Sequence, residues 1–344
     1  MIVKKMPIFQ GFPDFETVKF LTHQSSQKYN FSPVFYDIET TGLSRNSTFL
    51  YMIGTVAPEG NQWYFFQWMA ESREEEGTIL RIFSQFLNAH TCLISYNGER
   101  FDQPYLESRY DDYRLPSPFN NISSLDLYLE LKPLKNLLKL TSMKQPSLEK
   151  FLNLPKRSFP DGGECVSLYK KFLITGDSHL ADILMGHNQE DVYGLGRILT
   201  MQSYLCLLNS RYESTSAVYD DGNVIFTLQL PCSLPENFSN GTCEFYIKGQ
   251  EKEVRLLVKA KNRRLKRYYE NFKDYYYLPE EDTIIPRALG SGISKQYRKA
   301  ATKKTCYTWF SCSEQFLQDK NMQMEYLKHA LPVLIESLNA AQKV

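Results

Sequence analysis

The segment from residue 33 to residue 42, Pro-Val-Phe-Tyr-Asp-Ile-Glu-Thr-Thr-Gly, constrains the fold most, because it places acidic side chains within an apolar run. The apolar, β-prone residues followed by a turn signal predict a strand. Side chains alternate along a strand, so Asp37 and Glu39 project from one face and Val34, Tyr36 and Ile38 from the other. Two carboxylates at this spacing can share a cation, although an isolated pair also fits a solvent-exposed strand end.

The residues after this strand predict an α/β domain. Two further β-rich runs, 49–56 and 63–69, are separated by a strong turn signal, which predicts an antiparallel meander. A helix is expected over 74–88, where apolar residues recur at helical spacing and Glu74, Glu75 and Glu76 complement the helix dipole. A short apolar strand at 92–96 follows, and further helices are expected at 103–110, 147–154, 166–173 and 179–207.

The last third of the chain has a different pattern. Turn signals between β-prone runs predict hairpins at 217–230 and 242–259, and the last clear element is a helix over 313–340. A chain of 344 residues with 42% apolar residues is too long for one ordinary domain. We therefore expect an N-terminal extension at 1–30, an α/β domain at 31–207 and a β-rich C-terminal domain at 212–344 that ends in a helix.

Cysteine usage and hydropathy exclude several classes of protein. The seven cysteines are scattered without a C-x-x-C pair, which argues against a disulfide framework and against a structural zinc site. No run of eighteen apolar residues occurs, so no membrane partner is expected. A reducing cytoplasm is the expected location.

Two later motifs carry additional acidic residues. Asp102 follows the 92–96 strand and precedes Gln103-Pro104, which suits a helix N-cap or a carboxylate delivered to the sheet edge near Asp37. His187 and Asp191 are four residues apart on a predicted helix and therefore share its inward face. A lone histidine there is usually a core residue, whereas the aspartate beside it needs a compensating cation. Four carboxylates and a histidine would suit a divalent-metal site and phosphodiester hydrolysis.

The ordered motifs resemble those of a known family. Asp37-x-Glu39, Asn97-x-x-x-Phe101-Asp102 and His187-x-x-x-Asp191 are similar to the three exonuclease motifs of the DEDD group in the DnaQ-like, ribonuclease H-like superfamily. Within that group, residues 96–102, the His187-Asn188 pair and Ser167-Leu168-Tyr169 resemble the YprB-like ribonuclease H-like family. The likeness covers about residues 33 to 200.

The resemblance implies a mixed sheet of five strands and a two-metal 3′-to-5′ exonuclease site at one sheet edge. It implies Mg²⁺ or Mn²⁺ held by Asp37, Glu39, Asp102 and Asp191, with His187 orienting or deprotonating the attacking water. The DEDD group usually carries either a histidine five residues before the last aspartate or a tyrosine four residues before it. Here a histidine stands at the tyrosine spacing, so the identity of the general base stays open. Crowded carboxylates repel, so the metal-free site should be partly disordered or protonated.

Possible substrate contacts lie in both parts of the chain. Near the carboxylates these are Thr41, Asn97 and Asp126, for which turn or cap chemistry is the alternative. From Glu251 to Lys304 there are fifteen basic and seven acidic residues, interleaved with tyrosines. This composition suits binding of a single strand of nucleic acid, or else a solvated basic face over a tyrosine-rich core. The candidate contacts in this stretch are Arg263, Arg264, Lys266, Arg267 and Tyr268.

The sequence therefore predicts a metal-dependent nuclease, most simply a 3′-to-5′ exonuclease on single-stranded DNA or RNA. One alternative is a catalytically silent nucleic-acid-binding protein on the same fold, which retention of all four carboxylates argues against. Another is a structure-specific endonuclease, since one fold can serve both modes of cutting. The sequence does not choose between DNA and RNA, or fix polarity and oligomeric state.

Overall fold

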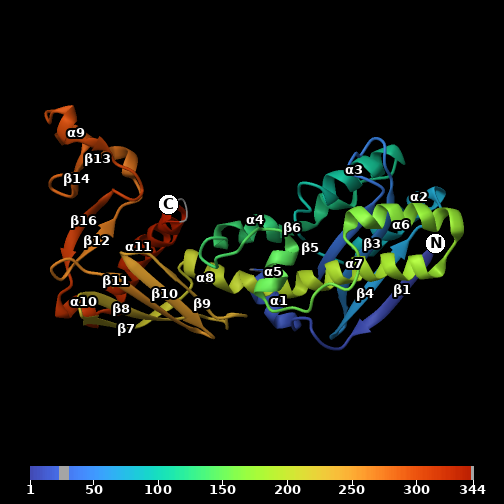
Figure 1. Ribbon diagram of the computed structural model, residues 1–344, viewed down its shortest axis with the longest axis horizontal. Helices are drawn as coiled ribbons and strands as arrows, with labels where there is room; N and C mark the ends of the chain where they lie inside the picture. The colour runs from blue at the N-terminus through green and yellow to red at the C-terminus, as the bar shows by residue number, and fades with distance from the viewer. Residues whose placement is uncertain (23–30, 342–344) are drawn as a thin grey trace. The chain divides into compact units, whose positions relative to one another are not determined.

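The computed structural model describes residues 1–22 and 31–341, and the chain forms two compact units (Figure 1). The first unit contains Met1–Lys132 and Thr141–Gln202, and the second contains Pro133–Leu140 and Ser203–Val344. The chain therefore enters the second unit briefly, returns to the first and then leaves it. The predicted domains 31–207 and 212–344 stay predictions about which segments fold independently.

The first unit is built on a mixed sheet, which confirms the predicted α/β class. Its strands, in spatial order, are β1 (Ile2–Ile8), β4 (Gln62–Met69), β3 (Leu50–Glu59), β2 (Pro33–Thr40), β5 (Cys92–Ser95) and β6 (Ser123–Asp126). The sheet has six strands instead of the expected five because β1 pairs antiparallel with β4 along its whole length. The segment 1–30, predicted as an extension, thus contributes an edge strand, and its residues 23–30 lie outside the described part of the chain.

The strand pairings bring the predicted motifs to one edge. The predicted meander is present, because β2, β3 and β4 pair antiparallel in succession. On the other side of β2, strand β5 runs parallel to it, with Pro33 opposite Cys92. Parallel neighbours end at the same edge of a sheet, so the residues that follow β5 lie near the carboxyl end of β2.

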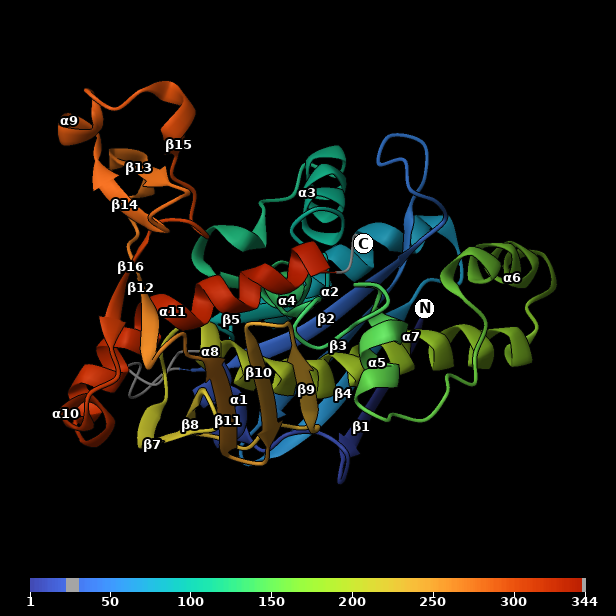
Figure 2. The ribbon, with the colours of Figure 1, turned by 60° about the vertical axis from the view of Figure 1, so that its left-hand side comes forward.

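Helices cover both faces of this sheet and create two apolar cores (Figure 2). One core joins Val34, Tyr36 and Ile38 of β2 to helices α2 (Glu76–Leu87) and α3 (Asp102–Asp112). The other core joins β3 and β4 to helices α6 (Gly162–Thr175) and α7 (Ser178–Leu199). The face of β2 that carries Asp37 and Glu39 is therefore the face that α7 covers. The remaining helices of this unit are α1 (Phe15–Leu21), α4 (Leu127–Leu131) and α5 (Gln145–Phe151).

Glu76 at the start of α2 has a different role from the dipole complement expected for residues 74–76. Its side chain is fully buried and accepts two 2.6 Å hydrogen bonds from Arg109 of α3. It also accepts a 2.8 Å hydrogen bond from the backbone N–H of Leu50. Because a buried charge needs a partner, this ion pair ties two helices to β3.

The second unit is β-rich and ends in a helix, as predicted. A five-stranded antiparallel sheet contains, in spatial order, β7 (Glu213–Asp220), β8 (Asn223–Gln229), β11 (Glu253–Lys259), β10 (Phe245–Gln250) and β9 (Phe238–Gly241). Strands β12 (Arg264–Tyr268) and β16 (Tyr307–Ser311) form an antiparallel ribbon. Beyond this ribbon lies a small sheet of β14 (Thr283–Pro286), β13 (Tyr275–Leu278) and β15 (Lys299–Ala300), together with α9 (Arg287–Gly290) (Figures 1 and 2).

The helix predicted over 313–340 is divided into α10 (Glu314–Gln318) and α11 (Lys320–Ala341). Asp319 leaves the helical conformation, and its side chain accepts hydrogen bonds from the backbone N–H groups of Asn321 and Met322. The predicted helix over 179–207 likewise ends as α7 at Leu199, and a 3₁₀ segment then leads into α8 (Leu205–Leu208). Among residues 1–22 and 31–341, no helix has the length and apolarity needed to cross a membrane.

Candidate active site

The acidic face of β2 meets helix α7. Asp37 and Glu39 lie on this face, while Val34, Tyr36 and Ile38 pack into the opposite core, as the strand alternation predicts. From α7, Asn188 donates a 3.0 Å hydrogen bond to the Asp37 carboxylate. His187, one residue earlier, reaches Glu39. The strand and the helix thus bring together residues that are about 150 positions apart in the sequence.

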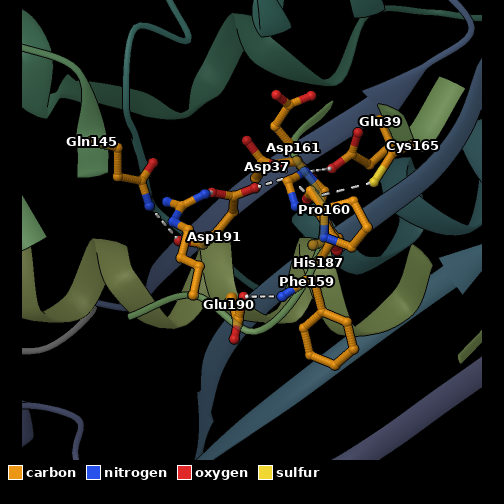
Figure 3. A network of polar contacts seen from close by, with 12 residues as sticks. Asp37, Glu39, Gln145, Phe159, Pro160, Asp161, Cys165, His187, Glu190 and Asp191 are labelled. Carbon is orange, nitrogen blue, oxygen red and sulfur yellow. Dashed lines mark hydrogen bonds and ion pairs between the residues drawn. The ribbon is translucent and has the colours of Figure 1, made fainter. Parts of the chain in front are cut away.

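Glu39, His187 and Asp191 form a compact cluster (Figure 3). The Nε2 atom of His187 lies 3.2 Å from a carboxylate oxygen of Glu39 and 3.2 Å from one of Asp191. One potential ligand atom from each of the three residues lies within 4.8 Å of the other two. Burial opposes a charge on His187, but the hydrogen bond that it donates to Glu39 and the negative charges of Glu39 and Asp191 outweigh this effect and raise the pKa of His187. The Nε2 atom of His187 thus links the two acidic residues.

Asp37 and Asp102 complete the acidic group. Asp102 is buried at the first turn of α3, where backbone N–H groups of Asp102 itself and of Ile38 hydrogen-bond to its carboxyl. Burial nevertheless raises the pKa of Asp102 to about 7, with Glu39 and Asp126 adding repulsion. Burial also raises the pKa of Asp37 well above its usual range, and the Asp191, Asp102 and Glu39 carboxylates contribute further. All four predicted carboxylates therefore act on one another electrostatically.

Arg157 is a site residue that the sequence did not predict. Its guanidinium lies 2.5 Å from Asp191 and forms two hydrogen bonds, at 2.7 and 2.9 Å, with Glu149 of α5. Burial raises the pKa of Asp191 to about 6, although the positive charges of Arg157 and His187 lower it. Arg157 precedes α6 in a segment without regular structure, so neither periodicity nor a motif points to it. Its role is visible only from the ion pairs.

A second unpredicted feature is the support beneath Asp37. The side chain of Asn188 is fully buried, and it accepts a 2.8 Å hydrogen bond from Gln67 of β4 while it donates to Asp37. It fits only because Gly54 stands opposite Asp37 on β3, since a Cβ atom at Gly54 would lie 1.9 Å from the Asn188 oxygen. A glycine inside a strand often marks such a close approach, so this signal was present in the sequence.

The predicted contacts near the carboxylates hold loops in place. Asp126 is buried and accepts hydrogen bonds from the backbone N–H groups of Asn97, Glu99 and Tyr128. Asn97 adopts the left-handed conformation, with φ of 65°. The Thr41 hydroxyl accepts a 3.0 Å hydrogen bond from the backbone N–H of Phe49 and closes the turn after β2. These are the cap and turn roles considered as alternatives, and any contact with a substrate stays a prediction.

The predicted basic contacts lie in the second unit, and the ribbon divides them between its two faces. Arg264, Lys266 and Tyr268 alternate with Leu265 and Arg267 along β12. Arg263 is in the preceding turn, over the ring of Tyr219. Tyr268 is only 6% exposed, and its expected contact with a substrate stays a prediction.

The acidic cluster lies on an inner strand of a mixed sheet, and a helix that carries a histidine and an aspartate covers it. These features define this part of the chain as a nuclease-type α/β fold with a potential metal site. Residues 34–202 match the family model described as RNase_H superfamily, so this region of the chain is similar to that superfamily. The predicted YprB-like ribonuclease H-like family is consistent with the match.

Other comparisons add less. No curated protein matches the chain in sequence. Among solved structures, the chain is similar to the family B DNA polymerase from the hyperthermophilic archaeon Pyrobaculum calidifontis, with a TM-score of 0.40 and 13% sequence identity. The similarity covers 64% of this chain and 39% of the polymerase chain. A likeness of this size does not bear on activity.

Proposed function

We propose that the protein is a metal-dependent nuclease that removes nucleotides from the 3′ end of single-stranded nucleic acid. The observation that carries the proposal is the convergence of Asp37, Glu39, Asp102 and Asp191 with His187 from three separate elements. The superfamily match over residues 34–202 supports a nucleic-acid hydrolase. The polarity, the preference for single strands and the cytoplasmic location belong to the proposal.

The donor set fits two ions of Mg²⁺ or Mn²⁺. Carboxylate oxygens are the ligands that these hard cations prefer, and Asp37, Glu39, Asp102 and Asp191 would hold them. Crowding and burial raise the pKa values of three of these carboxyls, and bound cations would remove that repulsion. When bound, such ions would lower the pKa of the attacking water and stabilise the leaving oxygen.

The protein's own groups would orient the ligands. Asn188 fixes one oxygen of Asp37, and the backbone N–H of Ile38 fixes the Asp102 carboxyl. His187 stands between Glu39 and Asp191, from where it would hold or accept a proton of the attacking water. The Nδ1 atom of His187 is buried without a hydrogen-bond partner among the described residues, so its ring is held mainly through Nε2.

One observation favours a second candidate, a silent nucleic-acid-binding protein. Arg157 and His187 both lie against Asp191, and their charges would compete with a metal ion for this carboxylate. If these ion pairs persist in the presence of metal ions, the protein would keep its fold but would not hydrolyse nucleic acid. Measurement of metal binding therefore decides between the two candidates.

The decisive experiment follows hydrolysis over time. Single strands of DNA and of RNA, labelled at the 3′ or the 5′ end, are incubated with the full chain and Mg²⁺ or Mn²⁺, alongside Asp37→Ala and Asp191→Ala. We expect early release of 3′-terminal nucleotides, and a loss of at least about a hundredfold in rate for either variant, because each removes a metal ligand. Asp182→Ala, an exposed aspartate on the same helix, is the matched control.

The alternatives give different outcomes. Full activity of Asp37→Ala or Asp191→Ala would refute the site. Cleavage of circular single strands or of branched substrates would identify an endonuclease instead. Binding of nucleic acid without hydrolysis, together with no detectable Mn²⁺ binding, would identify the silent protein.

A further inference from the structure

The second unit contains a hollow whose walls combine cations with aromatic rings. It has a volume of about 470 Å³ and lies among the ends of β11, β12 and β16 and the helix α11. Its basic lining residues are Lys259, Lys261 and Lys266, its acidic ones are Glu244 and Asp282, and its aromatic ones are Tyr268, Trp309 and Tyr326. A hollow that offers both kinds of group suits a ligand that is both anionic and flat.

The ribbon of β12 and β16 creates this combination by strand alternation. In its register, Arg264 stands opposite Ser311, Lys266 opposite Trp309 and Tyr268 opposite Tyr307. Residues directly opposite each other share a face, so these six side chains lie on one side of the ribbon. Leu265 and Phe310 lie on the other side, and Leu265 is fully buried. One face of the ribbon is therefore core, and the other is basic and aromatic.

Trp309 is the centre of the basic and aromatic face. The cationic groups of Lys261, Arg264 and Lys266 each lie 5.7 Å from a ring centroid of Trp309. The indole N–H donates a 3.0 Å hydrogen bond to the backbone carbonyl of Asp282, which fixes the orientation of the ring. A fixed ring bordered by cations is an arrangement that stacks a nucleobase while it neutralises the adjacent phosphates.

A tight turn holds the basic rim of the hollow. Asn262 and Arg263 both adopt positive φ angles, and Lys261 and Arg264 exchange two backbone hydrogen bonds of 3.0 Å. This two-residue hairpin loop places Lys261 and Arg264 next to each other at its base. Lys266 is paired with Glu244 at 2.7 Å, whereas the Lys261 side chain is 64% exposed and 4.0 Å from Asp282. Lys261 is thus available for an anionic ligand.

We propose that this hollow binds single-stranded nucleic acid, with one base stacked on Trp309 and neighbouring phosphates on Lys261 and Arg264. The basic residues extend along the chain from Lys259 to Lys266. There are more of them than one phosphate needs, so the hollow favours a strand of nucleic acid over a free nucleotide. That this strand is the substrate of the enzyme rests on the proposed function. Binding itself requires no metal and no turnover.

The test measures binding of the full chain to fluorescein-labelled single strands of about twelve nucleotides, oligo-dT or oligo-rU, in EDTA. We expect Lys261→Glu to weaken binding about tenfold and to reduce the salt dependence, because one phosphate contact is lost. Trp309→Ala should weaken binding by about tenfold, whereas Trp309→Phe, which keeps a stacking face, should retain most of the affinity. The matched control is Lys248→Glu, the same charge reversal on the exposed face of β10 in the same unit.

Several outcomes would overturn the proposal. Equal weakening by Lys261→Glu and Lys248→Glu would mean that diffuse charge alone attracts the strand. Full affinity in a folded Trp309→Ala would exclude stacking in the hollow. If Trp309→Ala unfolds, full affinity in Lys261→Glu would exclude binding of the strand at the basic rim of the hollow. Displacement of the strand by an equal concentration of inorganic phosphate would reduce the hollow to an anion site. Asp37→Ala that binds strands normally but does not cut them would leave the hollow intact, so the two proposals fail separately.

Discussion

At the scale of single residues, the candidate site is a balance of charges. Four carboxylates converge there, and Arg157 and His187 supply the positive charge that lies against Asp191. A buried carboxylate without a partner is costly, so these cations stabilise the metal-free site. The same ion pairs oppose the binding of a metal ion, because the Asp191 carboxylate cannot bind both these cations and a metal ion equally well.

Arg157→Gln should therefore strengthen metal binding. We expect Mn²⁺ affinity, measured by titration calorimetry, to rise about tenfold because a charge-assisted competitor for Asp191 is removed. The metal-free variant should unfold at a lower temperature, since Glu149 and Asp191 lose their counter-charge. Lys156→Gln, the same kind of change at the exposed neighbouring residue, is the control. Unchanged Mn²⁺ affinity in Arg157→Gln would contradict the competition.

The raised pKa values predict how stability depends on pH without metal. A carboxyl with a higher pKa in the folded than in the unfolded chain binds more protons when folded, so its contribution to the free energy of unfolding falls as pH rises. For Asp102 the window runs from an unfolded pKa of about 4 to a folded pKa of about 7. His187, whose pKa is also raised, loses its stabilising charge as pH rises through its folded pKa and acts in the same direction.

The unfolding temperature in EDTA should accordingly fall between about pH 5 and pH 7.5. Asp102→Asn should reduce this fall and raise the unfolding temperature at the upper pH by a few degrees, on the scale of about 2–4 °C for each kcal/mol. Asp182→Asn, at an exposed position on α7, should leave the pH profile unchanged. A profile of Asp102→Asn that coincides with that of the unaltered protein would refute the assignment.

Individual site residues were predictable to different degrees. Asp37, Glu39, His187 and Asp191 could be predicted because strand and helix periodicity place each pair on one face. Arg157 could not be, because it lies in an irregular segment and its partners are distant in the sequence or on other elements. The burial of Tyr268 could not be predicted either, since a basic and aromatic composition does not reveal which face of a strand is buried.

At the scale of elements, the approach of α7 to the sheet depends on Gly54. The absence of a side chain there lets Asn188 of α7 reach the sheet, where it donates a hydrogen bond to Asp37 and accepts one from Gln67. Helix and strand periodicity predicted both elements, and strand alternation predicted which face of β2 is acidic. The distance between α7 and the sheet could not be predicted, because it is set by packing between residues remote in the sequence.

Gly54→Ala should displace Asn188 and disturb Asp37. We expect a loss of about 1–3 kcal/mol in the free energy of unfolding from overpacking, and weaker Mn²⁺ binding. Denaturant unfolding and titration calorimetry measure the two effects. Gly292→Ala is the matched control, because a Cβ atom there meets no heavy atom within 4 Å. Equal stability and equal Mn²⁺ affinity in Gly54→Ala would show that Asn188 does not require this space.

At the scale of the whole molecule, the division into two units is not a division of the chain into two pieces. Residues 133–140 belong to the second unit, where Asn240 donates hydrogen bonds to the carbonyls of Asn136 and Leu137. Leu134, Leu137 and Leu138 in this segment are buried. The sequence predicted one boundary from the change in composition after residue 207, and composition carries no sign of this short earlier crossing.

A chain cut after residue 211 should therefore be less stable than the full chain and should also bind nucleic acid more weakly. Its 133–140 segment would lose the partners of its leucine side chains, so we expect exposed apolar surface and a lower unfolding temperature, measured by dye binding and thermal denaturation. Strand binding and its salt dependence should also decrease. A truncated chain that is monomeric, as stable as the full chain and equally tight in binding would contradict both expectations.

The crossing at residues 133–140 also has a consequence during synthesis, because this segment is made well before its partner Asn240. A ribosome releases the first unit's last residue, Gln202, before Asn240 of the second unit has been made. Until then, the loop of residues 133–140 lacks the hydrogen bonds that Asn240 donates to the carbonyls of Asn136 and Leu137. Domains generally fold as they emerge, at about 5–20 residues per second. The nascent chain should thus pass through an interval of seconds in which this loop is open to a chaperone, and slowing translation across 203–240 should lengthen it.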